Sequence, residues 1–216
     1  ADSAGVDIIN SSLGYNLFDD ASMDYTKTQL DGNTALVSKA ARLAISKGIF
    51  VVVSAGNDGN TSWSLVNPPA DVDGILAVGS ITSTGNLSGF SSIGPTTDGR
   101  IKPDVVALGS GVSVIKSNGN TGFTSGTSAA TPLITSLVAG LMQTFPELTV
   151  SALYDLVIAS GNMSNNPDNQ KGYGVPNYSG AKLIQLGEEP PEHTSAVYLF
   201  PNPSFGNTIK LEMDVP

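Results

Sequence analysis

Cysteine is absent from this sequence of 216 residues, which excludes disulfides and thiolate metal ligands within it. Basic residues are also scarce, since 10 Lys and Arg stand against 19 Asp and Glu and give a formal net charge of -9. No cluster of Lys or Arg offsets this charge locally. A chain of this kind is repelled by nucleic acid and by anionic membrane surfaces, so neither is expected as a partner.

Long apolar runs are lacking as well. The longest ones, such as residues 49–53, fall far short of the roughly 18 residues that a membrane-spanning helix needs, so no membrane span is expected. The opening residues ADSAG contain no basic segment of the kind that begins an export signal, and any such signal is expected to lie outside this sequence. Hydrophobic residues nevertheless make up 40% of the chain, which is enough for one sizeable core.

Short β-branched runs lie next to helical patterns along most of the chain, and this alternation predicts an α/β fold. Residues 49–53, 75–81 and 104–108 are continuous apolar runs, which are typical of strands buried on both faces. Such strands belong to parallel sheets that helices cover on both sides. We therefore expect a three-layer fold built on a parallel sheet whose first strand spans residues 6–10.

Helices are predicted where apolar residues recur with helical spacing. In residues 34–47 this pattern places Leu36, Ala40, Leu43 and Ala44 on the buried face. The other predicted helices span residues 132–145, with Pro132 in the first turn, and residues 150–160.

Two short stretches carry residues suited to chemistry. Ser128 lies in TSGTSAATP (residues 124–132), just before a long apolar helix, whose positive end favours an alkoxide or oxyanion. Asn57 follows an apolar strand at the edge of the sheet where α/β proteins place ligands, and its amide could donate to an oxyanion. The alternatives are a helix-capping loop without chemistry for Ser128 and an ordinary turn residue for Asn57.

Five separated stretches, in order, resemble motifs of the subtilisin-like serine proteases, the subtilase family or peptidase family S8. They are IINSSLG (residues 8–14), VVVSAGNDG (51–59), FSSIGPTTDGRIKPDVVALG (90–109), GTSAATP (126–132) and GYGVPNYSGA (172–181). The resemblance runs through most of residues 1–186 and implies a three-layer α/β fold and hydrolysis of peptide bonds in protein or peptide substrates.

The same resemblance implies roles for individual residues. Ser128 is the expected nucleophile, Asn57 and the Ser128 N–H form the oxyanion hole, and the Thr127 hydroxyl is an additional candidate donor. Residues expected to line the substrate are Ser12, Leu13 and Gly14, which pair with its backbone, and Ala55 and Gly56, which form a wall of the S1 pocket. The peptide bond between Pro68 and Pro69 is expected to be cis.

The catalytic Asp and His of this family, in its Asp-Thr/Ser-Gly and His-Gly-Thr/Ser motifs, have no counterpart in the sequence. The only histidine is His193, which follows Ser128 where the family places its histidine earlier in the chain. We expect the chain to be the C-terminal part of a catalytic domain, inactive on its own, in which the missing strands leave an open edge and favour self-association. The alternative is a pseudo-protease or peptide-binding domain without catalysis.

Composition divides the chain into three parts. The family resemblance implies that residues 1–186 are the C-terminal portion of a catalytic domain, and residues 187–195 (GEEPPEHTS) are acidic and rich in proline, as linkers are. Residues 196–216 contain YLFPNPSFGN and resemble the start of the C-terminal sorting modules of secreted Bacteroidetes proteins. This resemblance implies a secreted or cell-surface bacterial protein.

Residues 15–33 form a long acidic loop that contains Asp19, Asp20, Asp24 and Asp31. Carboxylate oxygens are ligands that Ca²⁺ prefers, so a structural Ca²⁺ is one interpretation of this loop. A solvated acidic loop without a metal is the other, because the spacing matches no EF-hand. No other metal or cofactor is expected.

Overall fold

The computed structural model describes residues 1–188. His193 and residues 196–216, predicted as part of a linker and as a separate β-module, lie outside the described residues. The strands and longer helices are, in chain order, β1 (Ile8–Ser11), α1 (Leu36–Ser46), β2 (Phe50–Ser54), β3 (Leu76–Ile81), β4 (Val105–Leu108), β5 (Val112–Ile115), β6 (Thr121–Thr124), α2 (Thr127–Thr144), α3 (Val150–Ala159) and α4 (Tyr178–Leu186). Three short 3-10 helices precede α1, at Asp2–Ala4, Ala21–Met23 and Lys27–Gln29.

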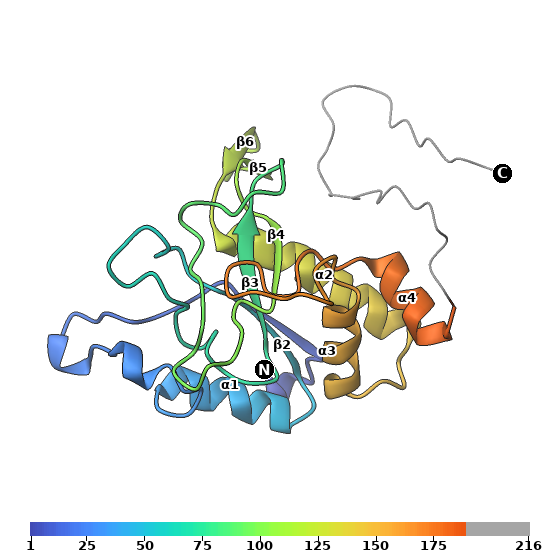
Figure 1. Ribbon diagram of the computed structural model, residues 1–216, viewed down its shortest axis with the longest axis horizontal. Coiled ribbons are helices and arrows are strands. Elements are labelled where there is room, and N and C mark those ends of the chain that lie inside the picture. The colour runs from blue at the N-terminus through green and yellow to red at the C-terminus, as the bar shows by residue number, and fades with distance from the viewer. Residues whose placement is uncertain (189–216) are drawn as a thin grey trace.

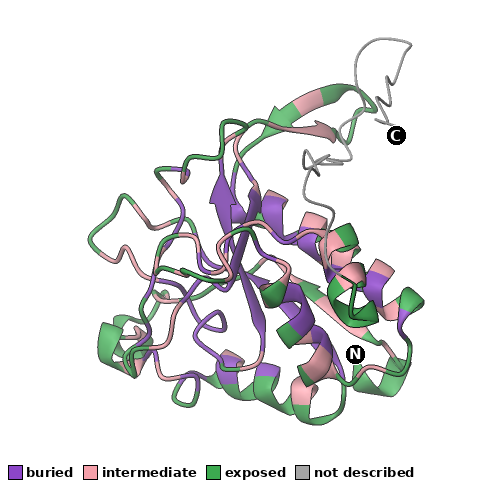
Figure 2. Ribbon diagram, turned by 45° about the vertical axis from the view of Figure 1, so that its right-hand side comes forward, coloured by how far each residue is buried: buried purple, intermediate pink, exposed green. Residues whose placement is uncertain are grey.

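A parallel sheet of β1, β2, β3 and β4, in that spatial order, forms the centre of the fold. Strands β2 and β3 are buried along their whole length, as their continuous apolar sequences predicted (Figure 2). Strands β5 and β6 form a separate antiparallel hairpin. The prediction of an α/β fold with a parallel sheet is therefore confirmed.

Helices cover both faces of this sheet and complete the three layers (Figure 1). Because successive strand residues point to opposite faces, β2 contributes to two cores. Its Phe50 and Val52 pack with residues of α2, α3 and α4, whereas Val51 and Val53 pack on the other face, where α1 lies. Helix α2 contacts all four strands of the sheet, so the position of its first turn is fixed by the centre of the fold.

The predicted buried face of α1 is largely wrong. Leu36 and Leu43 are 76% and 60% exposed, and of the four predicted residues only Ala44 packs against the core. The face toward the sheet is made instead by Ser38 and Ala41, which are buried. The helical periodicity of apolar residues placed the leucines on the buried face. Ser38 is buried there instead, because its hydroxyl donates to the buried carboxylate of Asp71.

Helix α2 begins earlier than predicted, at Thr127, so Pro132 lies inside the helix and not in its first turn. Proline has no N–H, which leaves the carbonyl of Ser128, four residues earlier, without its helical donor. The hydroxyl of Ser12 donates to this carbonyl at 3.1 Å. Because Pro132 leaves the Ser128 carbonyl free, this carbonyl can accept the hydrogen bond from Ser12 that links the residues after β1 to the start of α2.

A buried ion pair fastens β4 to its neighbours. Lys102 and Asp104 are each 2% exposed, and Nζ of Lys102 lies 2.7 Å from Oδ2 of Asp104. The same carboxylate accepts hydrogen bonds from the Ala77 N–H of β3 and from the Tyr154 hydroxyl of α3. Burial and the adjacent Asp104 raise the pKa of Tyr154, so this hydroxyl stays protonated and donates.

The two outer edges of the sheet differ. The outer edge of β4 is covered, because the Val106 N–H donates to the Gly174 carbonyl and the Tyr173 N–H donates to the Asp104 carbonyl. In the described residues no strand pairs with the outer side of β1. An uncovered strand edge is a template for pairing with another chain.

We therefore predict that the chain self-associates through β1. Asn10→Lys, at an exposed position of this strand, should weaken association because charge at a strand edge opposes pairing. Sedimentation velocity over a range of concentrations measures the effect, and Ser117→Lys adds the same charge beyond β5 as a control. A wild-type chain that sediments as a monomer at all concentrations would contradict the prediction.

Candidate active site

The predicted nucleophile lies where α2 begins. Ser128 is the second residue of this helix and is exposed. Gly126 precedes the helix with a φ of 154°, a conformation that residues with side chains rarely adopt. The first N–H groups of a helix have no acceptor within it and carry partial positive charge, so negative charge that develops at Ser128 is stabilised there.

The predicted oxyanion donor, Asn57, lies just beyond β2 and is exposed. Its side-chain oxygen accepts a hydrogen bond from the Thr127 N–H at 2.8 Å and another from the Thr127 hydroxyl at 3.0 Å. Because two donors hold this oxygen, the Nδ2 group is the end of the amide that remains to donate. Asn57 is thus oriented as an oxyanion hole requires.

Thr127 supports the site indirectly. Its side chain is fully buried, and its hydroxyl lies within 3.2 Å of the Gly56 carbonyl as well as near Asn57. The hydroxyl was predicted as an additional candidate donor to the oxyanion. The structure places it against Asn57 and Gly56, where it holds the asparagine.

The Ser128 hydroxyl contacts Ser12, a predicted substrate-binding residue that directly follows β1. It donates to the Ser12 carbonyl at 3.3 Å, and the Ser12 hydroxyl donates back to the Ser128 carbonyl. A carbonyl oxygen accepts a hydrogen bond but cannot take the proton at neutral pH. Within the described residues the serine therefore has an acceptor but no base, since His193, the only histidine, lies outside them.

The two predicted substrate segments are linked by the turn that contains the cis peptide bond. The bond between Pro68 and Pro69 is cis, as predicted. The Tyr15 N–H, next to Gly14, donates to the Pro68 carbonyl, and the Asn67 N–H donates to the Ala55 carbonyl. Leu13, which was predicted to pair with the substrate backbone, is 58% exposed.

Sequence reasoning missed two residues between these segments. Asn67 is only 6% exposed, and its Nδ2 donates to Asp58 Oδ2 at 2.6 Å. A Cβ added to Gly14 would lie 2.9 Å from the Asn67 Cβ, and one added to Gly56 would lie 2.7 Å from the Asn67 Nδ2. The only signals were the position of Asp58 within VVVSAGNDG and the position of Asn67 next to the predicted cis bond.

The acidic loop uses its carboxylates in local turns. Asp20 accepts from the Ser22 N–H at 2.9 Å, and Asp24 accepts from the Phe18 N–H at 2.7 Å. Among residues 1–188, no three acidic or histidine side chains gather closely enough to share a metal ion.

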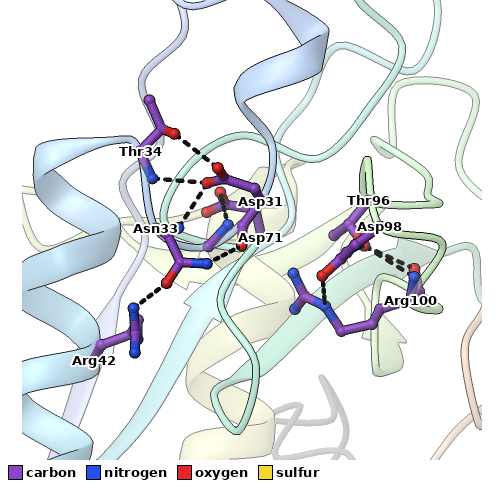
Figure 3. A network of polar contacts seen from close by, with 9 residues as sticks. Asp31, Asn33, Thr34, Arg42, Asp71, Thr96, Asp98 and Arg100 are labelled. Carbon is purple, nitrogen blue, oxygen red and sulfur yellow. Dashed lines mark hydrogen bonds and ion pairs between the residues drawn. The ribbon is translucent and has the colours of Figure 1, made fainter.

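A polar network holds the end of this loop against the body (Figure 3). Asp31 accepts hydrogen bonds from the backbone of Asn33 and Thr34, both at 2.7 Å. Asp71 is fully buried and accepts from the Ser38 hydroxyl at 2.6 Å and from the Gly32 N–H at 2.8 Å. Burial raises the pKa of the Asp71 carboxyl above its ordinary value despite these bonds.

A cavity of about 280 Å³ lies elsewhere, beside the end of β3. Its lining includes Ile81, Val106 and Lys171, and none of the predicted substrate residues is among the lining residues.

None of the helices within residues 1–188 is both long enough and apolar enough to span a membrane.

The fold and the site together are those of the subtilisin-like class, with a serine at the start of the central helix and an asparagine beyond a neighbouring strand. Residues 1–174 match the sequence profile of the subtilase family, peptidase S8, and the chain belongs to this family.

Relatives in sequence and in structure agree with this assignment. Subtilisin DY of Bacillus licheniformis is 33% identical over 150 residues, which cover 68% of this chain and 46% of the relative. Serine protease AprX of Bacillus subtilis is 30% identical over 207 residues, covering 86% of this chain and 43% of the relative. The chain thus spans less than half the length of these two relatives.

Solved structures show the same fold. The self-cleaved protease domain of PatA superposes with a TM-score of 0.65 at 24% identity, over 87% of this chain and 65% of that one. The prenylagaramide maturation protease PagA gives a TM-score of 0.65 at 25% identity, over 87% and 64%.

We predict that Thr127→Val lowers the free energy of unfolding by about 1–2 kcal/mol, because it removes a buried donor and leaves the N–H bond to Asn57 in place. Urea unfolding measures this change. Thr97→Val, which removes an exposed hydroxyl that donates to the Lys27 carbonyl, is the control and should cost less. Equal losses in the two variants would contradict a special role for Thr127.

We also predict that Asp71 makes stability depend on pH. Because its folded-state pKa is raised above the ordinary 3.8, its contribution is fully present below pH 3.8 and is lost as pH rises through the folded-state pKa. Asp71→Asn should lack this decline, so its stability relative to wild type should improve with rising pH. Urea unfolding between pH 3 and pH 7 measures the free energy of unfolding of each variant, and Asp73→Asn, at an exposed position, is the control. If the free energy of unfolding changed with pH in the same way for wild type and Asp71→Asn, the prediction would be refuted.

Proposed function

We propose that this chain supplies the nucleophile, the oxyanion hole and the substrate-binding segments of a serine endopeptidase of subtilisin type. The observation that carries the proposal is the hydrogen bonding of Asn57 by Thr127, which leaves the Asn57 Nδ2 group to donate beside the helix that begins with Ser128. Membership of the subtilase family supports it.

In the proposed reaction the Ser128 Oγ attacks the carbonyl carbon of a peptide bond while a base takes its proton. The carbonyl oxygen becomes an oxyanion, which the Asn57 Nδ2 group and the Ser128 N–H stabilise. The intermediate then collapses, the C–N bond breaks, and the amine leaves with a proton from the same base. Water hydrolyses the acyl-enzyme and regenerates the Ser128 hydroxyl.

The base in this proposal comes from polypeptide outside these 216 residues, together with the aspartate that orients it. A serine hydroxyl needs an imidazole to take its proton, and the sequence contains a single histidine, His193. The contact of Ser128 with the Ser12 carbonyl supports this view, because it gives the hydroxyl an acceptor without basicity. We expect the 216-residue chain to be inactive on its own.

The substrates in this proposal are proteins or peptides that bind in an extended conformation between residues 12–14 and residues 55–56. We also propose a secreted or cell-surface location in a bacterium. The likeness to subtilisins from Bacillus supports this location.

A fluorophosphonate probe tests the proposed function, because it reacts only with a serine that a base activates. The natural gene product should be labelled at Ser128, and the 216-residue chain should be labelled far more slowly. Ser128→Ala should abolish labelling, whereas Ser125→Ala, in the same loop, should not. A natural gene product that binds peptides but is never labelled would favour the rival function, a peptide-binding pseudo-protease.

A further inference from the structure

The cavity beside the end of β3 leads from solvent to apolar side chains of the sheet. Its volume of about 280 Å³ is close to the lower end of the range for small-molecule sites. Its inner wall includes Ile81 of β3 and Val106 of β4, which are 5% and 1% exposed. Residues 83–85 also line it and are exposed, so they mark the side that faces solvent.

The remaining wall comes from the segment between α3 and α4, which lies beside β4 (Figure 1). The Asn162 N–H donates to the Val175 carbonyl at 3.2 Å, and the Asn162 side-chain oxygen accepts from the Val175 N–H at 2.9 Å. The Val106 N–H donates to the Gly174 carbonyl and attaches this segment to the sheet. Met163 and Val175 are half-buried and add apolar surface. The walls are therefore held by contacts within the chain.

Lys171 gives the cavity a positive charge. It is the only charged residue among those that line the cavity, in a chain whose formal net charge is -9. Its Nζ donates to the Gly85 carbonyl at 2.9 Å, which places the ammonium group at the exposed side. No other hydrogen bond or ion pair of this Nζ is formed within residues 1–188. Because an ammonium group has three N–H donors, two remain for an anion.

The turn that carries Lys171 is fixed independently of its side chain. Asp168 Oδ1 accepts from the Gln170 N–H at 2.8 Å and from the Lys171 N–H at 2.7 Å. Asp168 is not among the residues that line the cavity. The cavity thus has an apolar inner wall and a cation at its exposed side.

We propose that this cavity binds a small carboxylate with an unbranched apolar tail, as a medium-chain fatty acid has. The carboxylate lies against the Lys171 ammonium group, and the tail covers Ile81 and Val106. Covering these side chains and the tail removes apolar surface from water, and the opposite charges attract one another. A cationic head group is repelled by Lys171, and a ligand without a tail leaves the inner wall uncovered.

Titration with octanoate tests the site, and the methyl group of Met163 reports binding inside the cavity. In the 216-residue chain labelled with ¹³C at its methionine methyl groups, octanoate should shift the Met163 signal. Met23 and Met142 do not line the cavity, so their signals are internal references. 1-Octanol and octylammonium carry the same tail with a neutral and a positive head group. Octanoate should bind at least about fivefold more tightly than either.

Variants assign this preference to the charge of Lys171. Lys171→Met keeps an apolar stem without the charge, so it should remove the advantage of octanoate over 1-octanol while 1-octanol still binds. Ser83→Asp, at an exposed lining position, adds an opposing charge and should reduce the same advantage. Lys182→Met removes a positive charge from an exposed position of α4 outside the cavity, and it should leave the advantage unchanged.

Equal binding of octanoate and 1-octanol by the wild-type chain would overturn the inference, as would an advantage of octanoate that persists in both Lys171→Met and Ser83→Asp. No shift of the Met163 signal, or equal shifts of the Met23 and Met142 signals, would overturn it as well. The site takes no part in the proposed hydrolysis. Fluorophosphonate labelling of Ser128 therefore reports on the proposed function separately.

Discussion

Two hydrogen bonds from Thr127 to the side-chain oxygen of Asn57 join the carboxyl edge of the sheet to the start of its central helix. The two residues are 70 positions apart, so this contact depends on β2 and α2 both being in place. Thr127 is fully buried whereas Asn57 is exposed, so the buried residue holds the exposed one in place. The two hydrogen bonds orient the amide of Asn57, the proposed oxyanion donor, and the geometry of the candidate site depends on them.

The small and hydroxyl-bearing residues before Pro132 are explained by the close approach of several backbones. A Cβ on Gly109 would lie 2.7 Å from the Gly126 carbonyl, and Gly126 has a φ that side chains disfavour. Inside the helix, Pro132 frees the Ser128 carbonyl, which Ser12 then contacts. Weak helix formers are therefore placed where α2 must meet β1 and the loop that follows β4, and the apolar part of α2 then packs across the sheet.

Features with a local physical cause were predictable from the sequence, and features that depend on distant partners were not. Strands β2 and β3 were predicted from their apolar residues alone, because a strand that is buried on both faces has a continuous apolar sequence. The buried face of α1 was mispredicted because Ser38 is buried by a hydrogen bond to Asp71, which lies 33 residues away. Asn67 was missed for the same reason, since its neighbours Gly14 and Gly56 come from separate segments. The likeness to a family predicted roles for Ser128 and Asn57, but it did not predict the hydrogen bonds by which Thr127 orients the asparagine.

In the proposed mechanism, substrate recognition and proton transfer are separable. The donors proposed to stabilise an oxyanion are held by contacts within the chain, so they would need no reorganisation when charge develops. Proton transfer needs a base, and the Ser12 carbonyl that contacts Ser128 cannot serve as one.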